Sequence, residues 1–248
     1  MRVTASIRSF PSAVAEPVRA GRRLLVFPHA AGCASFFRGW QSSLGSANAH
    51  VVQYPGREER GGERAVEDLV VLASSVAREI LAAGLRYDVF FGHSFGAYVA
   101  FETAHALEQA GRTPPALVVS SAAAPRTRTP VPYEPAAAVL DHLNRYEQLS
   151  PEILGEPDLL DTILGYAAVD LAAVADYRDH RGKKIRAAIV GIAGREDLPA
   201  IRDGLAAWAE HTEGEFRPVF VPGGHFYLRD EPPLPLLRSL LDRESETV

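Results

Sequence analysis

The chain has 248 residues, of which 47% are hydrophobic and 23% charged, and its formal net charge is −5. This balance is ordinary for a globular protein and, without a basic cluster, argues against a nucleic-acid partner. The single cysteine, Cys33, excludes an intramolecular disulfide and fits a reducing compartment. The N-terminus lacks the apolar core of a secretory signal, and no segment reaches the roughly 20 apolar residues of a membrane span. We expect a cytoplasmic protein with no membrane partner.

Apolar runs alternate with amphipathic segments along the chain, which predicts an α/β fold with a mostly parallel central sheet flanked by helices. Strands are expected at residues 24–27, 50–54, 89–91, 116–120, 187–192 and 216–221. Apolar residues at helical spacing predict helices at 66–83, 98–111, 200–211 and 234–241. We expect one domain over residues 1–248.

Residues 130–181 interrupt this alternation. They contain helical patterns at 136–147, 159–166 and 171–177 and no convincing strand. Open α/β sheets bind ligands outside the carboxyl ends of their strands. A helical insertion packed there would form a lid, which we expect at about 130–181. The alternative is that these helices simply cover a face of the sheet.

The pentapeptide Gly-His-Ser-Phe-Gly at 92–96 directly follows the apolar run at 89–91. This order predicts a strand, a sharp turn and a helix, with Ser94 at the apex of the turn. It is the pattern of the nucleophile elbow of Ser-His-Asp hydrolases. The backbone N–H of Phe95 is expected to face the position where an oxyanion would form, as one of two donors.

A serine nucleophile needs a base and an acid, which follow it in the α/β-hydrolase order. Of the five later histidines, only His225 lies in a loop just after a predicted strand. Asp197 follows the strand at 187–192 and is the expected acid. Its neighbour Glu196 is the main alternative, and Asp170 and Asp176 are more remote ones. Asp197 also has a purely structural interpretation, as the N-cap of the following helix.

The second oxyanion donor is expected from the loop after the first predicted strand, where Ala30 is our choice. Cys33 in the same loop has small apolar neighbours, which favours a packed side chain over a nucleophile. The sequence has no metal-ligand spacing and no phosphate-binding glycine loop. We therefore expect neither a metal nor a bound cofactor.

Taken together, several segments resemble the type II thioesterases of polyketide and nonribosomal peptide assembly lines. The similarity extends from about residue 24 to residue 228 and includes Phe37 and Trp40. Its most specific part is Pro-Gly-Arg-Glu-x-Arg, which has no general role in hydrolases. The segments are 25–32 (Leu-Val-Phe-Pro-His-Ala-Ala-Gly), 53–60 (Gln-Tyr-Pro-Gly-Arg-Glu-Glu-Arg), 91–97 (Phe-Gly-His-Ser-Phe-Gly-Ala), 120–125 (Ser-Ser-Ala-Ala-Ala-Pro) and 223–226 (Gly-Gly-His-Phe).

The resemblance implies an α/β-hydrolase fold with a helical lid. It also implies hydrolysis of acyl groups from the phosphopantetheine arm of an acyl or peptidyl carrier protein, which edits stalled or misprimed synthases. Carried over residue by residue, Ser94, Asp197 and His225 form the catalytic triad, and Ala30 and Phe95 the oxyanion donors.

The chain departs from the family pattern at three places. Ala31 stands where the family usually has glycine, and Phe95 where methionine is commoner. The lid segment at 167–170 reads Ala-Ala-Val-Asp instead of Leu-Arg-Ala-Asp, so its arginine is missing. These changes put the acyl preference and the carrier docking in question.

Because the chain itself is net negative, overall charge does not explain docking of acidic carrier proteins. A local basic patch or apolar contacts would be needed, and Arg57, Arg60 and Arg64 are candidates. The alternative is that these arginines are structural or solvated, with Arg57 bracing its loop.

Three other functions remain open from the sequence. On the same fold, an acyltransferase or cyclase would give the acyl group to an amine or hydroxyl, and a carboxylester hydrolase would prefer simple esters. A non-catalytic carrier-binding partner is the third, against which the complete triad argues.

Overall fold

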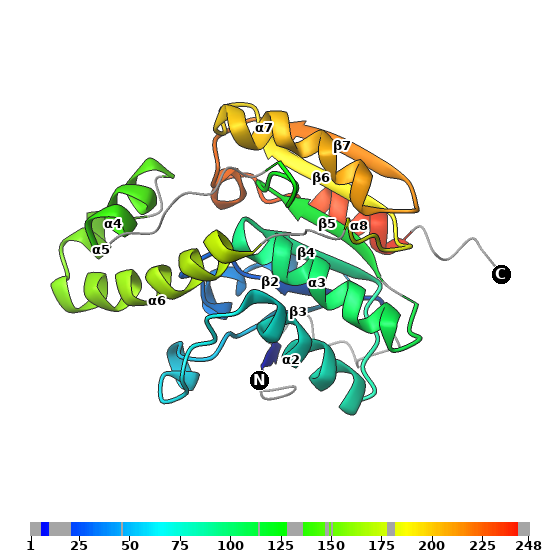
Figure 1. Cartoon of the computed structure of the whole chain (residues 1–248), viewed down its shortest axis with the longest axis horizontal. Coiled ribbons are helices and arrows are strands. Elements are labelled where there is room, and N and C mark those ends of the chain that lie inside the picture. Colours follow the sequence, from blue (N-terminus) through cyan, green and yellow to red (C-terminus); the bar gives the residue numbers. More distant parts are fainter. Residues whose placement is uncertain are drawn as a thin grey trace.

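A computed structural model describes residues 6–9, 21–45, 47–113, 115–127, 136–146, 149, 151–177 and 182–242. Its centre is a seven-stranded sheet in the order β1-β3-β2-β4-β5-β6-β7 (Figure 1). All neighbouring strands pair in parallel except β1 and β3. This confirms the predicted α/β fold. The strands are β1 (Ile7–Ser9), β2 (Arg23–Phe27), β3 (Asn48–Val52), β4 (Val89–His93), β5 (Ala116–Ser120), β6 (Ile189–Gly194) and β7 (Phe216–Val221).

Helices cover both faces of the sheet. On one face lie α2 (Leu69–Ala82), α3 (Phe95–Gln109) and α7 (Pro199–Leu205) with the 3-10 helix Ala206–His211. On the other lie the short α1 (Trp40–Ser43) and α8 (Leu234–Asp242). Two further 3-10 turns, Ala34–Phe37 and Glu58–Arg60, follow β2 and β3, and a third, Tyr227–Arg229, precedes α8.

The central strands are buried on both faces because successive side chains point to opposite sides. In β4, Phe90 packs in the core beneath α2 and α3, whereas Val89 and Phe91 pack in the core beneath α8. In β2, Leu25 packs in the same core as Phe90, and Leu24 packs in the core beneath α8. Continuous apolar runs are the sequence pattern of such strands, which is why these strands were predictable.

The edge strand β1 was not predicted from the sequence. It is only three residues long, too short to show an alternation. Tertiary contacts hold it in place: Ile7 is buried, and Ser6 donates from its backbone N–H and hydroxyl to Glu79 of α2 at 2.8 and 2.6 Å. Arg60 also donates to the Ser6 hydroxyl at 2.8 Å.

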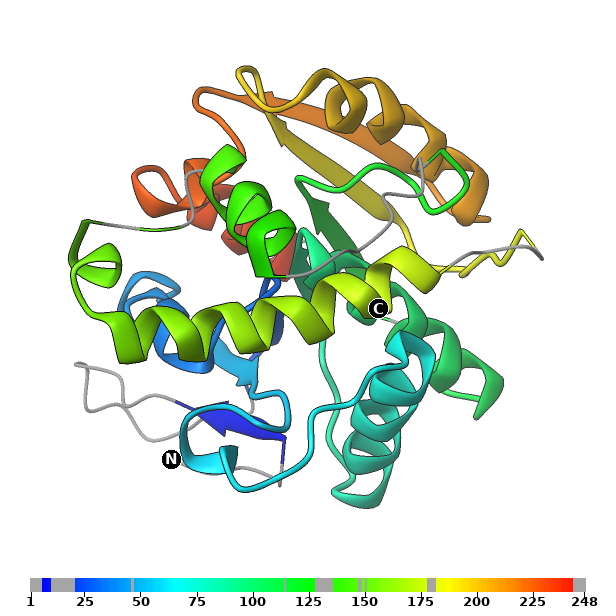
Figure 2. The ribbon, with the colours of Figure 1, turned by 60° about the vertical axis from the view of Figure 1, so that its left-hand side comes forward.

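Three helices lie between β5 and β6: α4 (Ala136–Arg145), α5 (Pro151–Leu154) and α6 (Pro157–Asp176). Two separate helices were expected at 159–166 and 171–177, but α6 is continuous over 20 residues. Pro157 begins it, and Gly165 lies inside it at a position where nothing is within 4 Å of an added Cβ. In Figure 2 α6 runs across the front of the molecule, with α4 above it. The expected ends of the insertion, 130 and 181, lie outside the described residues.

Several other boundaries differ from the expected ones: β3 begins and ends two residues earlier than predicted, and α2 begins three residues later. The helix predicted at 200–211 changes from α-helix to 3-10 helix at Ala206, and β6 begins and ends two residues later than predicted. The strand shifts occur at element ends, where local patterns carry the least information.

The closest backbone approach in this part of the fold is at Gly96, where α3 begins against the end of β2. A Cβ added there would lie 2.1 Å from the Phe27 carbonyl oxygen, whereas one added at Gly165 would meet nothing within 4 Å. We expect Gly96→Ala to lower the free energy of unfolding by about 3 kcal/mol, because backbone must move. Gly165→Ala, the matched control in a helix, should raise it by up to about 1 kcal/mol. Urea unfolding measures both, and equal effects would contradict the close approach.

Candidate active site

Ser94 lies at the turn between β4 and α3 with φ 53° and ψ −118°, an unusual conformation for a residue other than glycine. Its backbone N–H donates to the Ser120 carbonyl at the end of β5, at 2.8 Å. The Ser94 side chain does not cap α3 and is half-buried, so its hydroxyl remains available to a substrate. The strained turn predicted from the pentapeptide is therefore present.

His225 and Asp197 meet on loops that follow neighbouring strands. His225 Nδ1 lies 3.1 and 3.2 Å from the two carboxylate oxygens of Asp197, and both side chains are buried. An ionised carboxylate only accepts hydrogen bonds, so beside it Nδ1 carries the proton and Nε2 keeps the lone pair that can accept one. Gly194 permits this approach: a Cβ there would lie 2.2 Å from the Gly223 carbonyl oxygen.

Among the described side chains, Asp197 is the carboxylate that contacts the His225 ring. Glu196 is exposed, and only its backbone is used, donating to the Gly223 carbonyl. Asp170 forms a buried ion pair with Arg57. The Asp176 side chain lies outside what the structure describes.

The imidazole of His225 is covered by an aromatic ring from the inserted helices. Tyr146, just after α4, lies with its ring centroid 4.2 Å from that of His225. Among the described residues, no hydrogen bond joins the Ser94 hydroxyl to His225. Catalytic hydrogen bonds commonly tighten only when a substrate is bound.

Two further histidines form a neutral wall beside His225. The ring centroids of His93 and His225 are 5.2 Å apart, and those of His29 and His93 are 5.9 Å apart. Burial, with nearby positive charge, lowers the pKa of His29 to about 3 and that of His93 well below its usual value. Both rings stay uncharged near neutral pH, so they do not repel a proton arriving at His225.

The loop after β2, residues 28–34, lies against the start of α3 and is held from several sides. The Tyr54 hydroxyl donates to the Pro28 carbonyl at 3.1 Å. Arg57 Nη1 donates to the Gly32 carbonyl at 2.6 Å. The Ala34 N–H donates to Gln53 Oε1 at 2.7 Å. The motif at 53–57 therefore acts as a frame for this loop.

The inserted helix α6 holds the same loop from the other side. The Ala31 N–H donates to Asp170 Oδ2 at 2.8 Å, and Arg57 Nη2 pairs with the same oxygen. The sequence did contain a signal for this: Asp170 shares a helical face with Ala167, Leu171 and Val174, all buried. A carboxylate on an apolar face needs a buried partner.

Two of the three arginines considered for docking are buried. Arg57 and Arg60 are only 3% and 6% exposed and are fully engaged inside the protein, so a docking role is wrong for both. Arg64 is exposed and pairs with Glu67. Burial raises the pKa of the Cys33 thiol to about 11, as expected for a packed cysteine rather than a nucleophile.

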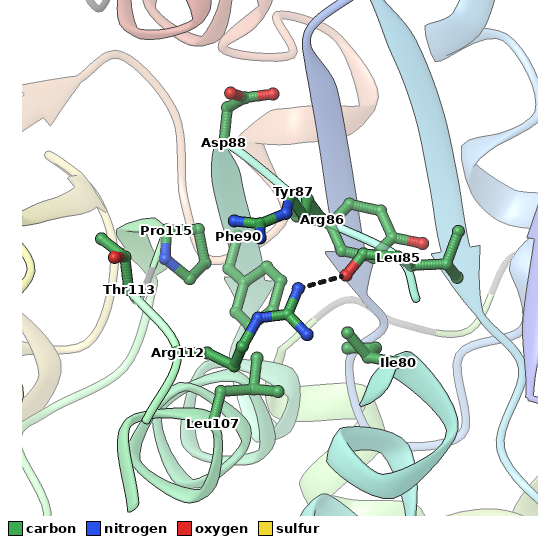
Figure 3. A pocket seen from close by; sticks show the side chains of 10 residues that line it. All are labelled: Ile80, Leu85, Arg86, Tyr87, Asp88, Phe90, Leu107, Arg112, Thr113 and Pro115. Carbon is green, nitrogen blue, oxygen red and sulfur yellow. Dashed lines mark hydrogen bonds between the residues drawn. The ribbon is translucent and has the colours of Figure 1, made fainter. Parts of the chain in front are cut away.

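Two cavities lie at opposite ends of the sheet. One, of about 380 Å³, borders the His225 and Asp197 loops and is also lined by Arg145 and Tyr146. The other, of about 180 Å³, lies where β4 and β5 begin, between the ends of α2 and α3 (Figure 3). There Arg112 donates to the Leu85 carbonyl at 3.1 Å. Only the first cavity adjoins the candidate residues.

Over the described residues, no group of three or more His, Cys, Asp or Glu side chains is placed to hold a metal ion. Within the same part of the chain, no helix is long and apolar enough to cross a membrane.

A family model described as the thioesterase domain matches residues 22–241. The chain is 37% identical to thioesterase PikA5 of Streptomyces venezuelae over 84% of this chain and 76% of that protein. It is 33% identical to a probable cadicidin biosynthesis thioesterase of Streptomyces griseus, over 90% of this chain and 61% of the relative. The solved type II thioesterase BorB of the borrelidin biosynthetic cluster superposes with a TM-score of 0.83 and 30% identity, covering 97% and 99% of the two chains.

The buried His29 predicts a specific acid sensitivity of the fold. Its pKa is lowered from 6.5 to about 3 in the folded state. Between these two pH values the unfolded chain therefore binds a proton at His29 that the folded chain does not bind. Stability from His29 is complete above pH 6.5 and falls by about 1.4 kcal/mol per pH unit towards pH 3. Between pH 7 and pH 5, we expect the free energy of unfolding of His29→Gln to fall by about 2 kcal/mol less than that of the parent protein. Urea unfolding at both pH values tests this, and parallel losses would contradict it.

Proposed function

The chain belongs to the thioesterase domain family, and from this we propose that it acts as a stand-alone type II thioesterase with Ser94, His225 and Asp197 as its catalytic triad. The observation that carries the proposal is the buried His225–Asp197 pair on the loops after β6 and β7, beside the elbow that bears Ser94. Similarity to BorB, a solved type II thioesterase, supports the assignment.

Acylation begins when Ser94 Oγ attacks the thioester carbonyl while His225 Nε2 takes its proton. Asp197 keeps the Nδ1 proton in place and stabilises the imidazolium that forms. The N–H groups of Phe95 and Ala30 donate hydrogen bonds to the carbonyl oxygen and so stabilise its negative charge. Phe95 begins α3, and the first N–H groups of a helix have no partner within it.

Collapse of the tetrahedral intermediate breaks the carbon–sulfur bond, and the thiol leaves with the proton from His225. A water then attacks the acyl-serine, giving up its proton to the same Nε2. The second collapse restores the Ser94 hydroxyl and releases a carboxylic acid. The thiol leaves readily, which favours acylation. Water must then be admitted for deacylation, because it is the nucleophile of that step.

The inserted helices α4–α6 act as a lid over this site in the proposal. Support comes from Tyr146, whose ring covers His225, and from the cavity of about 380 Å³ that Tyr146 and Arg145 border. The substrate is the acyl group on the phosphopantetheine arm of an acyl or peptidyl carrier protein. A long thin arm suits an entrance that a lid narrows, and the thiol end of the arm is the leaving group.

The triad assignment predicts a sharp contrast between two neighbouring carboxylates. Ser94→Ala should lower kcat by at least about 10⁴-fold, and Asp197→Asn by about 10⁴-fold, because His225 loses its nucleophile and then its orientation. Glu196→Gln, the matched control one residue away, should stay within about threefold of the parent. Steady-state hydrolysis with circular dichroism as the folding control measures all three. A severe loss in Glu196→Gln with an active Asp197→Asn would exchange their roles.

The substrate assignment predicts a preference for the carrier. One short acyl group is presented on a holo carrier protein, on a pantetheine-like thiol and as a p-nitrophenyl ester. We expect the highest kcat/KM for the carrier-bound form, with the free acid as the product by mass spectrometry. Equal or faster turnover of the small ester would instead indicate a general carboxylester hydrolase. An amide or ester product would indicate an acyltransferase or cyclase.

A further inference from the structure

We propose that Asp170 and Arg57 are positioning residues that hold the loop at 28–34 in the shape that presents the Ala30 N–H to the oxyanion. The inference rests on the proposed function, because it concerns the same oxyanion site. It assigns a catalytic purpose to a lid-helix carboxylate and to the arginine of the Pro-Gly-Arg motif.

The loop has a conformation that its own sequence does not favour. Ala31 has φ 59°, in the left-handed region that costs a residue with a Cβ roughly 1–2 kcal/mol. Some external contact must therefore stabilise it. The contact is the hydrogen bond from the Ala31 N–H to Asp170 Oδ2, at 2.8 Å. It fixes the peptide plane between Ala30 and Ala31, which is the plane next to the proposed donor.

Arg57 completes the arrangement with a guanidinium that binds both Asp170 and the loop. Nη2 pairs with the Asp170 oxygen that binds Ala31, and Nη1 donates to the Gly32 carbonyl at 2.6 Å. The guanidinium lies over the rings of Tyr54 and Tyr166, at 5.0 and 5.6 Å from their centroids. Its planar fork is thereby fixed in one orientation, which a lysine could not reproduce.

Charge gives a second reason for the pair. A lone carboxylate near an oxyanion site would oppose the negative charge that develops in the transition state. Arg57 cancels that charge, so Asp170 can hold the loop without this penalty. Burial raises the pKa of Asp170, and Arg57 and the Ala31 N–H oppose this rise. Buried ion pairs add little net stability compared with apolar packing, so a geometric role accounts better for this one.

Asp170→Asn tests the inference. The amide keeps the shape but loses the charge that Arg57 and Ala31 share. We expect kcat to fall about 10- to 100-fold with KM within about threefold, because losing one oxyanion donor costs about 10²- to 10³-fold in kcat. Adding Ala31→Gly to Asp170→Asn should raise kcat at least threefold over that of Asp170→Asn alone, since glycine adopts φ near 60° without strain. A merely structural role would not produce this rescue.

The exposed ion pair of Arg64 and Glu67 provides the matched control, and Glu67→Gln should leave kcat and KM unchanged. If Asp170→Asn does not fold, Arg57→Gln with Asp170→Asn removes both charges together and serves as the second variant. It should fold and show the same loss of kcat.

The results separate this inference from the proposed function. Ser94→Ala abolishing hydrolysis establishes the nucleophile by itself. With that result in hand, an unchanged kcat in folded Asp170→Asn, a rise in KM alone, or no rescue by Ala31→Gly would overturn the positioning role only.

Discussion

A buried ion pair between Arg57 and Asp170 joins three parts of the chain that are far apart in sequence: the loop after β2, the turn after β3 and the inserted helix α6. The contact places fixed charge in the interior, where only good geometry makes it tolerable. That geometry exists because β2 and β3 are neighbours in the sheet, so the segments following them emerge at the same edge. The candidate site is assembled around this edge, from loops whose positions the parallel strands impose.

The inserted helices do not all have the same relation to the body of the protein. α6 contacts α2 and α3 and is bound to the loop at 28–34 through Asp170, so it belongs mechanically to the site. At its far end Tyr177 donates to the buried Glu102 of α3 at 2.7 Å, and Lys183 pairs with the same carboxylate. α4 reaches the site through Tyr146 on the His225 ring. Under the proposal of a lid over this site, α4 and Tyr146 control the admission of substrate more than α6 does.

The sequence predicted what depends on short-range pattern. Apolar runs located six strands, and the Gly-His-Ser-Phe-Gly pentapeptide located the strained turn at Ser94. The strand β1 was missed because Ile7 is defined by tertiary pairing and not by any alternation. The ion pair of Arg57 with Asp170 was missed for a related reason. The two residues are 113 positions apart, and no local pattern in either segment indicates which residue is its partner. Tyr146 over His225 is of the same kind.

The separation of these partners also determines when the site can exist during synthesis. Ala31 precedes the carboxylate that holds it by 139 positions, and Asp197 and His225 are made later still, on either side of β7. A nascent chain that has completed β4 and α3 thus carries Ser94 without its acid, its base or a fixed oxyanion loop. On the proposed assignment, hydrolytic competence arises in a single late step, when the last strands join a sheet whose middle is already built.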